Sequence, residues 1–338
     1  MDTSENTHNF SYDLLRIIAI LCVIFNHTKQ YGYELYTAAS DPVSRYGSVF
    51  LAILCKIGVP LFLMVSGALL LGKEESPEKL MKKRVLPFAV IFAVMFLLQY
   101  LRVARAGGSD GLSAAGYLRC LLYDDPIAPY WFLRSYLIFL ITLPFLRAIA
   151  RQMNREWFVL LVVLQGITTV LDMTAALTGG SNAFSFFPVS AFLFYPLAGY
   201  YLSVHRNTGR KQFAVLIAVS LLILVFCGVL ALAKSGGEAA SEALFGPVWL
   251  YTLTVFLAVS RHTFSSGHAV LRELGSCVFG IYLIEDIVRN RLEFLIPLLA
   301  KTVGPLPACL LFVLAVFLVS AAAVWIGRKI PGIRFFLH

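Results

Sequence analysis

Long apolar stretches alternate with short polar segments along the whole chain. A helix needs about 20 residues to cross the hydrocarbon core of a bilayer, and about ten stretches come close to that length or exceed it. The pattern predicts an all-α fold, a polytopic transmembrane helix bundle of about ten helices. The predicted spans are Tyr12–Glu34, Val43–Gly72, Val85–Val103, Tyr130–Ile149, Glu156–Asp172, Ala183–Val204, Lys211–Ala233, Pro247–Arg261, Leu274–Pro297 and Gly304–Gly327.

The second predicted span is unusually long and contains Pro60. Proline has no backbone N–H, and its ring clashes with the carbonyl one turn earlier in a helix. We therefore expect a kink or a break in this span.

Hydrophobic residues make up 59% of the 338 residues and charged residues only 14%. A soluble domain carries more charge and less apolar sequence, so the composition excludes a soluble globular protein. No internal repeat or low-complexity segment divides the chain, which predicts a single domain over residues 1–338. The apolar run Ile17–Phe25 follows a polar, acidic tail, so we expect a retained first helix and not a cleaved signal peptide.

The net charge of +9 comes from basic residues that lie mostly between the apolar stretches. That placement is typical of membrane topology and not of nucleic-acid binding. With the N-terminus in the cytoplasm, the inside segments hold sixteen basic residues and the outside segments six. The excess predicts that both termini are cytoplasmic. We expect a multi-pass protein of the inner cell membrane. The sixteen are Lys73, Lys79, Lys82, Lys83, Arg84, Arg147, Arg151, Arg155, Arg206, Arg210, Lys211, Arg261, Arg272, Arg328, Lys329 and Arg334, and the six are Arg45, Arg102, Arg105, Arg119, Lys234 and Lys301.

The longest polar loop, Ala104–Pro129, lies outside the cell on this topology. It is either a surface beside an external substrate or a plain connector. The six cysteines form no CxxC pair and lie mostly inside apolar runs, where thiols pack as small hydrophobes. We expect no disulfide framework, no zinc site and no iron–sulfur site.

Ionisable side chains inside a predicted span are costly, so each is a candidate for function. The first span contains Asp13, Arg16 and His27, and Gln30 and Glu34 continue its polar face. Arg16 and His27 are eleven residues apart, which places both on one side of a helix with His27 roughly 16 Å further along the axis. Asp13 can pair with Arg16 one turn away. The alternative is that Arg16 extends to the inner surface and His27 makes a structural interhelical hydrogen bond.

The ninth span carries a second polar cluster, Glu285, Asp286, Arg289 and Asn290. The spacing allows Glu285 to pair with Arg289 and Asp286 with Asn290. Glu285 is expected near the depth of His27, where a carboxylate can orient an imidazole and raise its basicity.

Lys79, Lys82, Lys83 and Arg84 form the strongest basic cluster of the chain, directly before Pro87. One interpretation is a topology signal or a contact with anionic lipid. The other is a binding site for a phosphate-rich cytosolic cofactor, whose negative charges Lys and Arg offset.

The run Tyr12-Asp13-Leu14-Leu15-Arg16, followed by ten residues and then His27, resembles the arginine-x10-histidine signature of the acyltransferase-3 family. The stretch from Gly58 to Gly67 resembles the second helix of that family, and the basic run into Pro87 resembles the entry to its third. The resemblance covers most of the chain. This sequence departs from the family's pattern in having Glu285 where histidine is frequent, and lysine in a basic run that is usually rich in arginine.

The resemblance implies an integral membrane O-acyltransferase that takes an acyl group, most often acetyl, from cytosolic acyl-CoA. The acceptor it implies is a hydroxyl of an envelope glycan or another extracytoplasmic molecule, as in O-acetylation of a polysaccharide. In this interpretation His27 is the general base, or carries the acyl group covalently. Arg16 holds a donor phosphate or the surroundings of His27, Asp13 orients Arg16, and Glu285 supports His27. Lys82, Lys83 and Arg84 bind the phosphates of the donor in this interpretation.

Two other functions compete with this one. A proton-coupled secondary transporter would also place His, Glu and Arg inside the membrane. Such transporters often have two repeated halves, and this sequence has none that we detect. A non-catalytic membrane scaffold or sensor would leave the charged face of the first span without a purpose.

Overall fold

The computed structural model describes residues 9–105, 112–123, 130–180, 182–184, 190–205, 209–233, 246–261 and 268–337. All regular secondary structure within these ranges is helical, which confirms the predicted all-α class. Of the long polar loop Ala104–Pro129, residues 106–111 and 124–129 lie outside the described ranges.

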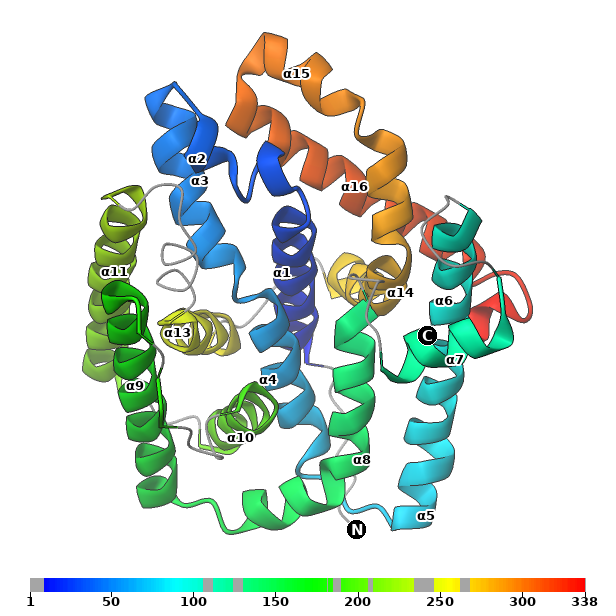
Figure 1. Ribbon diagram of the computed structural model, residues 1–338. Coiled ribbons are helices and arrows are strands. Elements are labelled where there is room, and N and C mark those ends of the chain that lie inside the picture. The colour runs from blue at the N-terminus through cyan, green and yellow to red at the C-terminus, as the bar shows by residue number, and fades with distance from the viewer. Residues whose placement is uncertain are drawn as a thin grey trace. The chain divides into compact units, whose positions relative to one another are not determined.

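The chain divides into two compact units, residues 1–69 with 153–338 and residues 70–152. Organisation as a single domain stays a prediction. The first unit contains α1 (Phe10–Asn26), α2 (Leu35–Ala38), α3 (Pro42–Cys55), α4 (Gly58–Leu70), α9 (Arg155–Thr178), α10 (Ala191–Val204), α11 (Arg210–Ala233), α13 (Val248–Ser260), α14 (His268–Leu292), α15 (Leu295–Val303) and α16 (Pro305–Gly327). The second contains α5 (Pro77–Leu80), a π-helical turn (Met81–Val85), α6 (Leu86–Arg105), α7 (Ala114–Leu122) and α8 (Trp131–Arg151). Within the first unit α1, α14 and α16 pack against one another, and α3 also contacts α1 (Figure 1).

Among the described residues, six helical segments are long and apolar enough to cross a membrane. They are Pro42–Leu70, Pro77–Arg105, Trp131–Arg151, Arg155–Thr178, Arg210–Ala233 and Pro305–Gly327. Large apolar side chains such as Leu222 on α11 and Phe145 on α8 are exposed on these segments, an arrangement that suits lipid and not water.

The predicted number of about ten spans stays a prediction, because the other four predicted helices differ from the six. Helices α1, α10 and α13 have only 17, 14 and 13 residues. Helix α14 has 25 residues but carries Glu285, Asp286, Arg289 and Arg291 in its second half.

The break predicted near Pro60 is confirmed and lies between α3 and α4, at Lys56 and Ile57. Lys56 N–H donates to the Ile53 carbonyl and Ile57 N–H to the Leu54 carbonyl, so the helix tightens before it restarts. Pro60 has no N–H to donate to the carbonyl one turn earlier, which explains why the α-helical pattern is interrupted there.

The first predicted helix is shorter than expected, since α1 ends at Asn26 with His27 as its C-cap. Thr28 donates its hydroxyl to the Phe25 carbonyl and accepts the Tyr33 N–H, which turns the chain into a short 3-10 helix at Lys29–Tyr31. The prediction that Gln30 and Glu34 continue the polar face of the same helix is therefore wrong. Local hydrogen bonds of Thr28 outweigh helix continuation here.

Candidate functional site

Helices α1 and α14 run parallel and bring the two polar clusters of the sequence together. Three contacts occur in the same order along both helices: the rings of Phe10 and His268 stack at 4.1 Å, Asp13 lies against Gly275, and His27 contacts Glu285. A Cβ atom at Gly275 would lie 2.5 Å from Asp13 Cβ, so the missing side chain allows this close approach. The crossing of the two helices positions the site.

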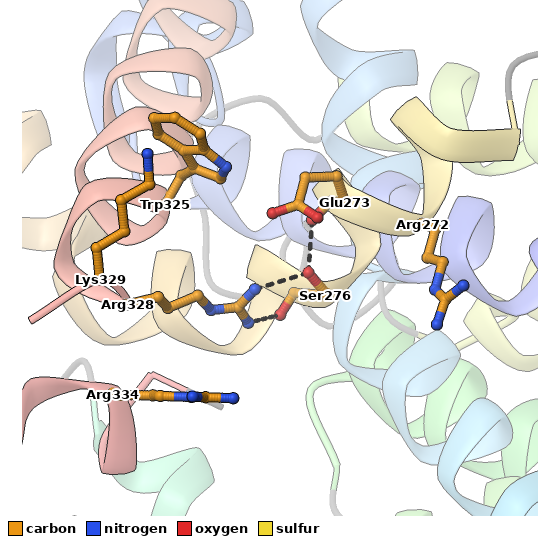
Figure 2. Close-up of a pocket in the computed structure, with 7 residues that line it drawn as sticks. All are labelled: Arg272, Glu273, Ser276, Trp325, Arg328, Lys329 and Arg334. Carbon is orange, nitrogen blue, oxygen red and sulfur yellow. Dashed lines mark hydrogen bonds between the residues drawn. The ribbon is translucent and has the colours of Figure 1, made fainter. Parts of the chain in front are cut away.

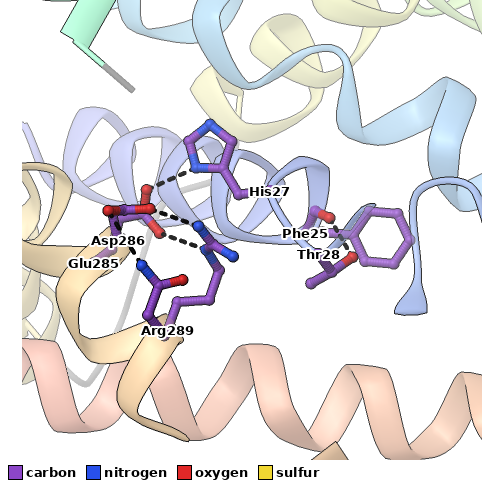
Figure 3. A network of polar contacts seen from close by, with 7 residues as sticks. Phe25, His27, Thr28, Glu285, Asp286 and Arg289 are labelled. Atoms are coloured by element: carbon purple, nitrogen blue, oxygen red, sulfur yellow. Dashed lines mark hydrogen bonds and ion pairs between the residues drawn. The ribbon is translucent and has the colours of Figure 1, made fainter. Parts of the chain in front are cut away.

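His27 and Glu285 form the central contact of the site, with 2.6 Å between His27 Nδ1 and Glu285 Oε1 (Figure 3). The Glu285 side chain is 1% exposed and the His27 side chain 29% exposed. Nδ1 is thus occupied by the carboxylate, while the second ring nitrogen points away from it (Figure 3). The two positions are 258 residues apart, so no helical spacing relates them. The sequence suggested the pairing only because both residues were expected at a similar depth in the membrane.

The carboxylate of Glu285 is also close to a cation on its own helix. Arg289 Nε lies 3.9 Å from Glu285 Oε2, and Arg289 Nη2 lies 2.5 Å from Asp286 Oδ1. Asn290 donates to the other oxygen of Asp286 at 3.4 Å. The predicted partners on this helix are therefore in reach, but Arg289 binds Asp286 more closely than it binds Glu285.

Asp13 and Arg16 make the pair that their spacing predicts, at 3.3 Å between Asp13 Oδ1 and Arg16 Nη1. The Asp13 side chain is buried against α14, and a third of the Arg16 side chain is exposed. Asp13 and His27 thus both face the helix that carries Glu285, and Arg16 is held by Asp13 about three helical turns from His27.

The basic cluster before Pro87 is helical and continues directly into α6. Lys82, Lys83 and Arg84 lie on the π-helical turn, where Leu86 N–H donates to the Met81 carbonyl. The wider turn suits Pro87, which has no N–H for the carbonyl one turn earlier. Lys82 and Lys83 are exposed, and Lys82 also pairs with Glu78 at 2.7 Å on the surface.

Arg84 is engaged by Glu75, a residue that the sequence did not single out. Arg84 Nη2 and Arg147 Nη2 lie 2.7 and 2.8 Å from the two oxygens of Glu75, and Arg147 Nε donates to the Leu70 carbonyl. Hydrogen bonding to Arg84, with a further contribution from Arg147, lowers the pKa of Glu75 from 4.5 to about 2. No spacing signal could reveal this cluster, because its members are 9 and 72 residues apart.

The arrangement of His27 and Glu285 can carry out general base chemistry. A buried carboxylate that accepts a hydrogen bond from Nδ1–H leaves the other ring nitrogen as a proton acceptor and stabilises the imidazolium that forms. Within the part of the chain that the structure describes, no group of three or more His, Cys, Asp or Glu side chains is placed to hold a metal ion.

Comparison with known proteins adds one match. A family model described as an acyltransferase domain matches residues 9–326, which is nearly the whole chain and includes both units. No curated protein and no solved structure matches the chain significantly.

Proposed function

This chain belongs to the acyltransferase-3 family, and from that premise we propose that it is a membrane-embedded O-acyltransferase dependent on acetyl-CoA. It transfers the acyl group of cytosolic acyl-CoA to a hydroxyl of an envelope glycan or another extracytoplasmic acceptor. The observation that carries the proposal is the 2.6 Å contact between His27 Nδ1 and the buried carboxylate of Glu285.

In the proposed reaction His27 takes the proton of the acceptor hydroxyl on the ring nitrogen that faces away from Glu285. The acceptor oxygen then forms a bond to the thioester carbonyl carbon. As the tetrahedral intermediate collapses, the carbon–sulfur bond breaks and the imidazolium returns the proton to the leaving thiolate. Between these two proton transfers, the Glu285 carboxylate stabilises the positive charge of the imidazolium and so lowers the activation barrier.

Arg16 and Asp13 have a supporting role in this proposal. Asp13 holds the guanidinium of Arg16 at 3.3 Å, and Arg16 then either binds a donor phosphate or sets the charge around the imidazole. A covalent acyl-histidine relay is a variant of the same proposal, in which the free ring nitrogen attacks the thioester first.

We assign the phosphates of acyl-CoA to the exposed side chains of Lys82 and Lys83, with Arg84 beside them. Arg84 is held in a largely buried pair with Glu75, whereas the pair of Lys82 with Glu78 is exposed to solvent and Lys83 is exposed as well, so the two lysines can more easily turn toward an anionic ligand. In the assay below, Lys82→Gln/Lys83→Gln should raise the KM for acyl-CoA about tenfold with kcat unchanged, because it removes binding that is equal in the ground and transition states. An unchanged KM would remove these two lysines from the donor site.

The test is acyl transfer from radiolabelled acetyl-CoA in membranes that contain the protein at matched levels. His27→Ala should lower the rate of labelling of the envelope fraction at least about a hundredfold, the contribution expected of a positioned general base. Glu285→Gln keeps an oxygen near Nδ1 but has no charge, and should lower kcat about tenfold with little change in KM.

His205→Ala is the matched control, because His205 is exposed at the end of α10 and, among the described residues, contacts Tyr201 of its own helix. It should keep wild-type turnover. Wild-type labelling by His27→Ala would refute the catalytic role. Accumulation of substrate in sealed vesicles without any acyl donor, together with no release of coenzyme A, would instead establish the transporter.

A further inference from the structure

A cationic pocket of about 370 Å³ lies in the first unit, between the first turns of α14 and the end of α16 (Figure 2). The side chains of Arg272, Arg328, Lys329 and Arg334 line it, and Glu273 is the single carboxylate among the described residues of the lining. None of these four cations makes an ion pair with a carboxylate in the described part of the chain. The pocket therefore carries an excess of positive charge that an anion would offset.

The pocket is shaped by tertiary contacts, because the chain after α16 folds back and is anchored to α14 and α16. Arg328 Nε donates to the Leu337 carbonyl at 2.9 Å, and its two other nitrogens bond the hydroxyl and the carbonyl oxygen of Ser276 on α14 (Figure 2). The Leu337 side chain is buried over Gly280 and Gly327, whose missing side chains make room for it. This anchoring holds Arg334 beside the pocket.

The surroundings of the pocket are apolar and aromatic as well as basic. Lys329 Nζ lies 3.2 Å from the centre of the Trp325 ring, and Trp325 itself is exposed. Ile326, Ile330, Ile333 and Phe335 on the same segment are exposed too. Tryptophan and exposed aliphatic side chains next to arginine and lysine are typical of the boundary between lipid headgroups and acyl chains.

We propose that this pocket binds the phosphate group of an anionic phospholipid headgroup. The volume is sufficient for a phosphate with its glycerol, and the exposed apolar side chains would contact the acyl chains. The four cations belong to the set that the charge distribution predicts on the cytoplasmic side, and basic pockets between helices on that side bind lipid headgroups in other membrane proteins. The inference does not depend on acyl transfer.

The experiment measures binding of fluorescent phosphatidylglycerol to the purified full-length protein in an uncharged detergent. The variant Arg272→Gln/Lys329→Gln/Arg334→Gln removes three pocket cations but keeps Arg328, which anchors the C-terminal segment. It should bind phosphatidylglycerol about tenfold more weakly or worse, since each basic residue near the surface adds to anionic lipid affinity. Phosphatidylcholine should bind weakly to both proteins.

Arg155→Gln/Arg210→Gln/Lys211→Gln is the matched control, because it removes the same number of exposed cations from the same predicted side. Its affinity should stay within about twofold of wild type if the pocket, and not total charge, binds the lipid. Equal affinity of the two triple variants would overturn the proposal. So would displacement of phosphatidylglycerol by coenzyme A or inorganic pyrophosphate at lower concentration than by the lipid itself, because the ligand would then be a soluble phosphate.

If the pocket triple variant fails to fold, Arg334→Gln alone should lower the affinity for phosphatidylglycerol at least about threefold, and wild-type affinity of that variant would count against the pocket.

Discussion

At the scale of single residues, two carboxylates with little exposed surface are each held by two basic side chains, one of which comes from a distant part of the chain. Glu285 has His27 at 2.6 Å and Arg289 at 3.9 Å, and Glu75 has Arg84 and Arg147 at 2.7 and 2.8 Å. A buried charge without such partners would be strongly destabilising. The first carboxylate faces a histidine that can exchange a proton, whereas the second faces two arginines that cannot, so only the first arrangement suits acid–base chemistry.

Glu75→Gln should destabilise the protein by about 3 kcal/mol near neutral pH, because it leaves the buried guanidinium of Arg147 without its anion. The pKa of Glu75 is lowered to about 2 in the folded protein, from an ordinary 4.5. The carboxylate therefore stabilises the fold fully above about pH 5, and this contribution disappears as the pH falls toward 2.

Thermal unfolding of the purified wild type and the variant between pH 7 and about pH 3 measures both effects. The difference in Tm between the two proteins should shrink as the pH falls. Glu156→Gln, at an exposed position on α9, is the control and should change Tm little at any pH. A difference that stays constant down to the lowest pH would show that Glu75 is not ionised in the pair.

At the scale of helices, the first unit depends on a close crossing of α4 and α10. A Cβ atom on Gly67 would overlap the Pro196 carbonyl, and a Cβ atom on Gly199 would overlap the Met64 carbonyl. The two backbones are therefore in direct contact at this crossing. Small residues allow such approach between membrane helices, where no hydrophobic effect drives them together.

Gly67→Ala should lower stability by about 3 kcal/mol, since backbone atoms on the facing helix cannot rotate away as a side chain would. Gly199→Ala should have a similar effect. Gly166→Ala is the matched control, because a Cβ atom at this helical glycine meets nothing within 4 Å. It should be neutral or stabilise α9 by up to about 1 kcal/mol. Thermal unfolding in one detergent compares the three variants, and equal Tm values would show that α4 and α10 do not cross this closely.

At the scale of the whole molecule, the apolar surface and the charge distribution give one consistent description of a membrane protein. In the part of the chain that the structure describes, six helical segments are long and apolar enough to span a bilayer, and many of their large side chains are exposed. The basic residues that the sequence predicts inside outnumber those it predicts outside. Both termini are therefore expected in the cytoplasm.

Cysteine labelling of intact cells by a membrane-impermeant maleimide tests that orientation. Lys301→Cys, at an exposed predicted outside position, should be labelled on intact cells, whereas Lys211→Cys should be labelled only after the cells are opened. The wild-type protein measures the background from its six native cysteines. The opposite pattern would invert the topology and place the cationic pocket of α14 and α16 outside.

The sequence by itself determined the all-helical class, the break near Pro60 and the pairing of Asp13 with Arg16. Each of these depends on hydropathy, on a missing backbone donor or on neighbours one turn apart, all of which act over a few residues. The sequence overestimated the length of the first helix, because the helical spacing of Gln30 and Glu34 does not reveal the local hydrogen bonds of Thr28 that end the helix.

Only the tertiary structure decided which distant residues meet. His27 reaches Glu285 because α1 and α14 run parallel and approach closely at Gly275, and Glu75 binds Arg147 across 72 residues. The cationic pocket exists because the chain after α16 folds back onto α14 through Arg328 and Leu337. These contacts arise from packing between separate helices, whose relative register and direction no local pattern specifies.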